Sequence, residues 1–201
     1  MKSFLLFISV LLKAAVILAC SLSFPFMGSE PTSTPSYNIN DCTQAAQPAQ
    51  EDIDLALNLP GNTFASEEWK RSFSVEENRV SVTWVNDTEG ALAYLENLIY
   101  NCGYTQADID SFFSEQALKE VILQNYPQPK LVSSCRDKKD ELSLFELSAL
   151  LHDQTYLVRV WVMKPSDTRL MYLFMTFPET SQDLLDQYSH QIFPGLSACK
   201  S

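Results

Sequence analysis

The chain has 201 residues, of which 46% are hydrophobic and 11% aromatic, a composition that fits one globular domain with appended segments. It excludes a wholly disordered chain and a collagen-like repeat. The 14 Lys and Arg residues against 25 Asp and Glu residues give a formal net charge of −11. Because nucleic acid binding needs a basic surface that neutralises phosphates, we expect no nucleic acid partner.

The N-terminus has the order of features found in signal peptides: a positive charge, an apolar core and a small residue before a cleavage point. Lys2 supplies the charge. Residues 4–12 form an apolar run broken by one serine, and residues 14–19 form a second run that ends at Cys20. These features predict a signal peptide over residues 1–19.

The segment Ile17-Leu18-Ala19-Cys20 resembles the lipobox of bacterial lipoprotein precursors, in which an aliphatic and a small residue precede a cysteine. The resemblance implies that Cys20 is acylated and becomes the mature N-terminus, so that membrane lipid is one partner of the protein. Two features depart from the pattern. Lys13 interrupts the apolar core, and Ile17 stands where leucine is usual.

Two other interpretations of this segment stay open. Residues 4–27 are long enough to cross a bilayer, although Lys13 near the middle would cost about 2.5–3.5 kcal/mol. An ordinary secretory cleavage is the other alternative. All three interpretations export the domain, and lipidation predicts an extracytoplasmic location at a bacterial cell membrane.

The chain contains five cysteines, an odd number that normally leaves one thiol to explain in an exported protein. If Cys20 carries lipid, four remain to form two disulfides in an oxidising compartment: Cys42, Cys102, Cys135 and Cys199. They lack the close pairs of a zinc site. Three connectivities are open, and we favour Cys102 with Cys135 and Cys42 with Cys199, because the second pair would join the two ends of the domain.

Residues 28–50 are rich in Ser, Thr, Pro, Asn and Gln and have no aliphatic periodicity. Such a segment buries too little apolar surface to offset the entropy of ordering it. We therefore expect residues 20–50 to be a lipidated cysteine with a disordered tether, and residues 51–201 to form a single globular domain.

The first half of this domain predicts a hairpin and two helices. Residues 72–75 and 79–85 look like strands joined at Glu77-Asn78. A helix is expected before Gly103, and a second from Thr105 until Pro127. The expected apolar stripe of the first helix is Leu92, Leu95, Leu98, Ile99 and Cys102, and that of the second is Ile109, Phe112, Phe113, Leu118, Val121 and Ile122.

The second half predicts an antiparallel meander followed by a helix. Residues 130–134, 142–151, 155–163 and 170–177 are strand-like and separated by turn residues. A last helix is expected from a capping box at Thr180 and Asp183 until Pro194, with Leu184, Leu185, Tyr188, Ile192 and Phe193 inward.

The expected fold class is therefore α+β, with an antiparallel sheet of about five to six strands packed against helices. The order of elements resembles that of the α/β/α sandwiches typified by the photosystem II extrinsic protein family, without a shared motif. This resemblance is one of topology and implies no function.

Pairing the strands through their turns sets His152 opposite Thr155 and Lys164 opposite Arg169. One face then holds only apolar side chains and is the expected core. The other face is mixed, and it supplies the candidate contact residues for an envelope protein partner: Arg159, Trp161, Tyr172 and Phe174. The alternative is that the hairpin or residues 52–64 cover this face.

Catalysis has little support in the sequence, and we assign no catalytic, metal or cofactor residue. The two histidines are His152 near a turn and His190, which Asp186 precedes by one helical turn. Such a pair is usually a solvated surface contact. Three function classes remain: a non-catalytic binding or assembly lipoprotein, which we prefer, an envelope enzyme with an unrecognised site, and a structural component of a membrane complex.

Overall fold

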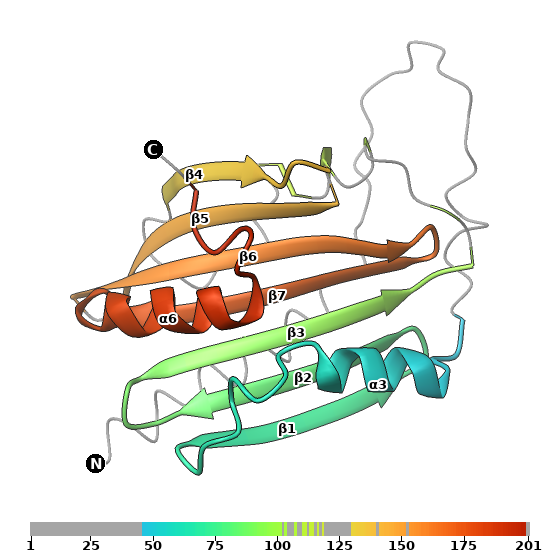
Figure 1. Ribbon diagram of the computed structural model, residues 1–201, viewed down its shortest axis with the longest axis horizontal. Coiled ribbons are helices and arrows are strands. Elements are labelled where there is room, and N and C mark those ends of the chain that lie inside the picture. Colours follow the sequence, from blue (N-terminus) through green and yellow to red (C-terminus); the bar gives the residue numbers. More distant parts are fainter. Residues whose placement is uncertain are drawn as a thin grey trace.

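The computed structural model of the chain describes residues 46–101, 103, 107, 110–111, 113–114, 116, 118, 130–139, 141–151 and 153–199. Within these residues, seven strands form one antiparallel sheet in the order β1-β2-β3-β7-β6-β5-β4. Two helices, α3 and α6, lie on the same face of this sheet (Figure 1). The domain is thus mainly β, with more strands than the five to six that we predicted.

The predicted hairpin is confirmed in a longer form. Strand β1 (Trp69–Glu76) pairs with β2 (Arg79–Asn86) along its whole length, and Glu76 lies opposite Arg79 across the predicted two-residue turn. Alternation of Val80, Val82 and Trp84 with polar residues places these three in the core.

The predicted helix before Gly103 is wrong, because this segment is strand β3 (Ala91–Ile99). All nine of its residues are buried, so both faces of the strand are covered, and seven of the nine side chains are apolar. A run that is apolar on both faces satisfies the helical spacing as well as the strand spacing, and periodicity alone does not separate them.

The polar residues just before β3 are of the types that commonly begin a helix. The side chain of Asn86 accepts hydrogen bonds of 3.1 Å from the main-chain N–H groups of Thr88 and Glu89, as a helix N-cap would. Here it closes a turn instead, and Gly90 completes that turn with φ +64°. The same residue types serve both kinds of structure.

The predicted meander is confirmed as four strands: β4 (Lys130–Arg136), β5 (Leu142–Leu151), β6 (Gln154–Ser166) and β7 (Arg169–Pro178). The register between β5 and β6 differs from the prediction by two residues. Leu151 lies opposite Gln154, and Asp153 in the turn has φ +62°. A shift of two residues leaves each side chain on its predicted face.

The register between β6 and β7 is wrong by one residue, which is the more serious error. Val160 lies opposite Phe174, not Leu173, because a register shift occurs between Met163 and Ser166. A slip of one residue exchanges the two faces of a strand. Every side chain of β7 therefore lies on the face opposite to the predicted one relative to β6.

Helix α3 (Gln50–Asn58) and helix α6 (Gln182–Ile192), which follows the short 3-10 helix η2 (Glu179–Ser181), cover one face of the sheet. The last helix was predicted, but its cap was not. Ser181, not Thr180, is the N-cap residue, and its side chain makes no capping hydrogen bond. The side chain of Leu185 is buried against the sheet.

Two apolar clusters flank the sheet. The one under the helices includes Trp69, Trp84, Trp161 and Phe177, and the one on the opposite face includes Val158, Val160, Tyr172 and Phe174. Phe113 and Leu118 belong to the second cluster, as their predicted inward positions require. Most of the second predicted helix, including Thr105, Ile109, Phe112, Val121 and Ile122, lies outside the described residues.

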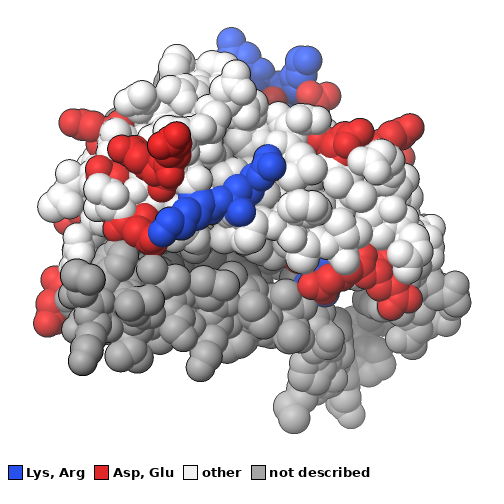
Figure 2. Space-filling model, turned by 90° about the horizontal axis from the view of Figure 1, so that it is seen from below, with Lys and Arg blue, Asp and Glu red and all other residues white. Residues whose placement is uncertain are grey.

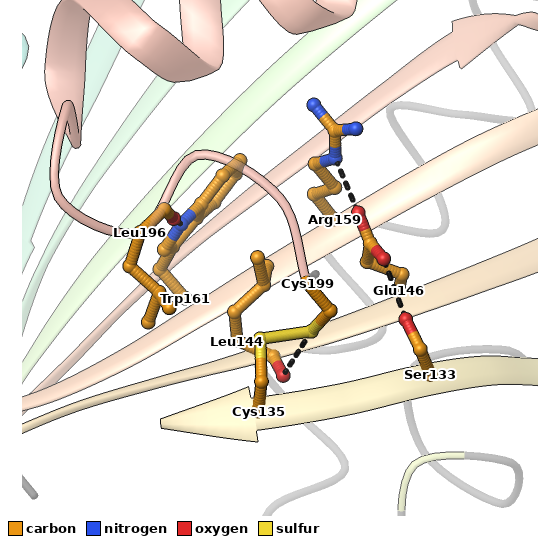
Figure 3. Close-up of a disulfide and its surroundings, with 8 residues drawn as sticks. All are labelled: Ser133, Cys135, Leu144, Glu146, Arg159, Trp161, Leu196 and Cys199. Carbon is orange, nitrogen blue, oxygen red and sulfur yellow. Dashed lines mark hydrogen bonds and ion pairs between the residues drawn. A yellow bond between two sulfur atoms is a disulfide. The ribbon is translucent and has the colours of Figure 1, made fainter. Parts of the chain in front are cut away.

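A disulfide joins Cys135 of β4 to Cys199, in the segment after α6 that returns across β6 and β5 (Figures 1 and 3). Both cysteines were predicted to form disulfides, but the favoured pairing of Cys102 with Cys135 and Cys42 with Cys199 is wrong. The bond therefore fastens the end of the chain to the outermost strand. Cys20, Cys42 and Cys102 lie outside the described residues.

Candidate functional site

The four predicted contact residues do not form one open face. Trp161 is fully buried under the segment that follows α6, where its ring stacks on Phe193 with ring centroids 5.1 Å apart. Tyr172 and Phe174 are buried on the other face of the sheet, because of the one-residue slip in β7. The alternative, in which these side chains are covered, is the correct one. Residues 52–64 do lie on the helix face and share a cluster with Trp161, as that alternative expected, but Trp161 itself lies under Phe193 and Leu196.

Arg159, the fourth of these residues, is the buried centre of a partly buried polar row on the helix side of the sheet. The register places Arg159 opposite Glu146 and Glu146 opposite Ser133. The Nε of Arg159 donates to Glu146 at 3.0 Å, and Ser133 donates to the other carboxylate oxygen (Figure 3). Arg159 is only 7% exposed, so its side chain is not available as a contact residue for a partner.

Helix α6, which lies on the sheet, contributes two further side chains to this row. The guanidinium of Arg159 donates to Ser189 Oγ at 2.9 Å and forms an ion pair of 2.6 Å with Asp186. Asp186 therefore pairs with Arg159, whereas His190 is exposed on the helix. The predicted Asp186–His190 contact is replaced by one that holds α6 on the sheet. His152 lies outside the described residues.

A second polar row crosses the opposite face of the sheet and was not predicted. The register aligns Ser81, Glu96 and Tyr172 on β2, β3 and β7. Glu96 is completely buried, and its two carboxylate oxygens accept hydrogen bonds from Tyr172 and, at 3.1 Å, from Arg79. Tyr94 donates to Ser81 at 3.2 Å beside it. A fully buried glutamate requires such partners.

Burial controls the ionisation of this row. Burial raises the pKa of Glu96, although the hydrogen bond from Tyr172 and the charge of Arg79 oppose it. Burial and the nearby Glu96 carboxylate raise the pKa of Tyr172 well above 10.0 and that of Tyr100 to about 12. Burial alone would lower the pKa of Arg79, but Glu96 and Glu76 raise it.

Perturbed carboxyl groups are common in active sites, so this row is the candidate that sequence reasoning missed. The signal available was the polar pair Glu96-Asn97 within an otherwise apolar nine-residue run. However, Glu96 is fully enclosed, with Tyr94, Tyr172 and Phe113 packed together around it. Both of its oxygens have partners within the chain, so the geometry is that of a structural network.

The described residues provide neither a candidate metal site nor a membrane-spanning helix. No group of three His, Cys, Asp or Glu side chains among them is arranged to hold a metal ion. Nor do any of the helices in this part of the chain have the length and apolar character needed to cross a membrane. The exposed large apolar side chains there are Leu55, Phe73, Val75 and Val132, two of which lie on the edge strand β1.

Comparison with known proteins finds distant structural likenesses only. No protein-family model and no curated protein matches the chain. A mutant of protein Mog1 is 9% identical, with a TM-score of 0.41 over 65% of this chain and 78% of that one. LpqN, which is involved in cell envelope biogenesis of Mycobacterium tuberculosis, is 12% identical, with a TM-score of 0.40 over 63% of this chain and 76% of that one. Likenesses at this level say nothing about what the present chain binds or does.

Proposed function

We propose that the chain is an extracytoplasmic lipoprotein, tethered to a bacterial membrane through Cys20, whose folded domain is a non-catalytic binding or assembly module. The observation that carries the proposal is the disulfide between Cys135 and Cys199. Disulfides persist in oxidising compartments and are rare in the cytosol. The bond agrees with an N-terminus that resembles a lipoprotein signal peptide.

The two polar rows support the non-catalytic part of the proposal. Each consists of an arginine and a glutamate on neighbouring strands, and Ser, Tyr or Asp side chains supply further hydrogen bonds. A catalytic acid or base needs to reach a substrate proton. Glu96 is fully buried, and Glu146 is held by Arg159 and Ser133, so both are occupied within the fold.

Lipidation is tested by expressing the full chain and its Cys20→Ala variant in a bacterial host supplied with a labelled palmitate. The wild-type chain should incorporate label and sediment with membranes, whereas Cys20→Ala should lose the label and leave the membrane fraction. Cys42→Ala is the matched control, because it removes another cysteine of the N-terminal region and should keep the label. Unchanged membrane retention of Cys20→Ala, with an intact N-terminus, would establish an uncleaved anchor instead.

A further inference from the structure

Strand β1 is an end strand of the described sheet. It pairs with β2 over eight consecutive residues without a register shift, and no other described strand lies beside it. Figure 1 shows β1 at the outer edge of the sheet. An edge strand presents a row of N–H and C=O groups that another strand is able to pair with.

The opposite edge strand has features that commonly block such pairing, and β1 lacks them. Strand β4 has a register shift between Leu131 and Ser133, and its Cys135 is bonded to the C-terminal segment. Strand β1 contains no proline and no bulge. Its backbone is therefore regular enough to add a strand.

Apolar side chains on β1 also favour a partner. Phe73 is 56% exposed and Val75 is 44% exposed, and they alternate on the same face of the strand as the buried Trp69. Aromatic and β-branched side chains are stabilising when they meet across a strand pair. A strand added beside β1 would cover both.

The charges of β1 specify which strand fits. Two copies of β1 related by a two-fold axis perpendicular to the sheet would pair in antiparallel fashion, with every side chain on its own face. If the axis lies midway between the two Phe73 residues, residues 70–76 of one copy pair with residues 76–70 of the other. Lys70 of each copy then faces Glu76 of the other, Ser72 faces Ser74, and Phe73 faces its equivalent. Figure 2, which views the β1 side from below, shows a basic strip between acidic groups.

We propose that this edge binds a second copy of the chain by antiparallel pairing of the two β1 strands, centred on Phe73. Centring on Ser72 would put Lys70 opposite Ser74 and leave Glu76 without a basic partner. Centring on Ser74 would pair only residues 72–76 of the strand. The Phe73 register alone combines seven paired residues with two opposite-charge pairs. Since it needs only the folded domain, this inference is independent of lipidation at Cys20.

Cross-linking tests the register in the full chain. One strand pair buries less than the about 1,200–2,000 Å² of a standard interface, so the dimer is expected to be weak and is best trapped covalently. Residues directly opposite in an antiparallel pair have Cα atoms about 4.5–5.5 Å apart, within the range of a disulfide. Diagonal neighbours are about 7–8 Å apart and lie outside it.

Phe73→Cys should therefore give a disulfide-linked dimer under mild oxidation, well above the background from the native cysteines of the wild-type chain. Ser72→Cys and Ser74→Cys are the matched controls, because each exposed serine faces the other serine and not its own equivalent. Dimer formation by Phe73→Cys no greater than wild type would overturn the proposal. So would a yield from Ser72→Cys or Ser74→Cys that equals or exceeds that of Phe73→Cys.

Charge reversal tests complementarity in the Phe73→Cys chain. Lys70→Glu places a glutamate opposite Glu76 of the other copy, and Glu76→Lys places a lysine opposite its Lys70. Each change alone therefore sets like charges against each other and should lower the dimer yield several-fold. The two changes together restore opposite charges and should recover the yield. Each variant also loses an intramolecular ion pair, Lys70–Asp87 or Glu76–Arg79, so melting curves are measured in parallel. A double variant that folds but cross-links no better than the single variants would contradict the proposal.

Discussion

The indole N–H of Trp161 donates a hydrogen bond of 2.8 Å to the main-chain oxygen of Leu196, 35 residues further along the chain. Both groups are buried, and Phe193 stacks on the same indole ring. Trp161 therefore holds the segment after α6 against the sheet, beside the disulfide that fixes Cys199 to β4.

Trp161→Ser is expected to lower the free energy of unfolding by about 3–5 kcal/mol, the usual cost of truncating a buried large aromatic side chain. Trp161→Phe should cost less, because it keeps most of the apolar contact and loses the hydrogen bond to Leu196. Urea denaturation of both variants measures the difference. A near-neutral Trp161→Ser would show that this side chain is exposed and would return it to the list of contact residues.

The disulfide between Cys135 and Cys199 spans 64 residues of sequence, so it restricts the unfolded chain strongly. Replacing both cysteines by serine should lower the free energy of unfolding by about 2–4 kcal/mol. Each single replacement should cost a similar amount, since either one removes the same bond. If reduction of the wild-type protein leaves its denaturation midpoint unchanged, the bond does not contribute as proposed.

With Cys135 and Cys199 paired, Cys42 and Cys102 are the two remaining cysteines if Cys20 carries lipid. We expect them to form the second disulfide. Mass spectrometry of peptides digested without reduction identifies it as one linked pair. Quantitative alkylation of both thiols in the unreduced protein would contradict the expectation, as would a peptide that joins Cys42 to Cys199.

The order of the last four strands was predictable because each has clear turn residues on both sides and a regular apolar pattern. The position of β7 relative to β6 was not, because the shift between Met163 and Ser166 falls at Pro165, a residue type that is found both in turns and at strand irregularities. This one-residue shift in register determines which face of the sheet Tyr172 and Phe174 occupy. The candidate contact surface failed for this reason, although the burial of these residues was foreseen as the alternative.

The side-chain contacts within the two polar rows were not predictable from the sequence for a different reason. Glu146 and Arg159 are 13 residues apart, and Glu96 and Tyr172 are 76 apart. Their contacts depend on strand order and register, neither of which local pattern specifies. Glu96 was also hidden within a segment predicted to be helical, where a single glutamate is an ordinary surface residue.

The raised pKa of Glu96 predicts a specific pH dependence of stability. An acid whose pKa is higher in the folded than in the unfolded protein holds its proton more tightly when folded. Its contribution is fully present below the unfolded pKa of about 4.5 and is lost as the pH rises through the folded value. Relative to Glu96→Gln, the wild-type protein should therefore lose stability as the pH rises above about 4.5.

Denaturant titrations from pH 4.5 to 8 on both proteins measure this difference. Glu96→Gln preserves the shape of the side chain but keeps only one of the two oxygens that accept from Tyr172 and Arg79, so it lowers stability by a pH-independent amount. The pH-dependent part of the difference between the two proteins then reports the titration of Glu96. Parallel stability curves for the two proteins over this range would show that Glu96 does not titrate with a raised pKa.

Asp52 in the first turn of α3 is expected to fix this helix to the sheet. Its Oδ1 accepts a hydrogen bond of 2.6 Å from Arg169 Nε on β7, and its Oδ2 accepts bonds from Arg169 Nη2 at 3.2 Å and from the N–H of Ala49 at 2.8 Å. Asp52→Asn removes the charge and keeps the size of the side chain. Since hydrogen bonds to charged groups contribute about 1.5–3 kcal/mol, it should lower the free energy of unfolding by about that amount.

Asp54→Asn is the matched control, because Asp54 is an exposed acid on the same helix whose side chain accepts a hydrogen bond of 2.8 Å from Gln50. It should change stability by less than about 0.5 kcal/mol. A double-mutant cycle of Asp52→Asn with Arg169→Gln then isolates the pair, and a coupling of about 1 kcal/mol or more is expected for residues in direct contact. Equal effects of Asp52→Asn and Asp54→Asn, or additive effects in the cycle, would mean that α3 is held by its apolar contacts with Ala56 and not by this ion pair.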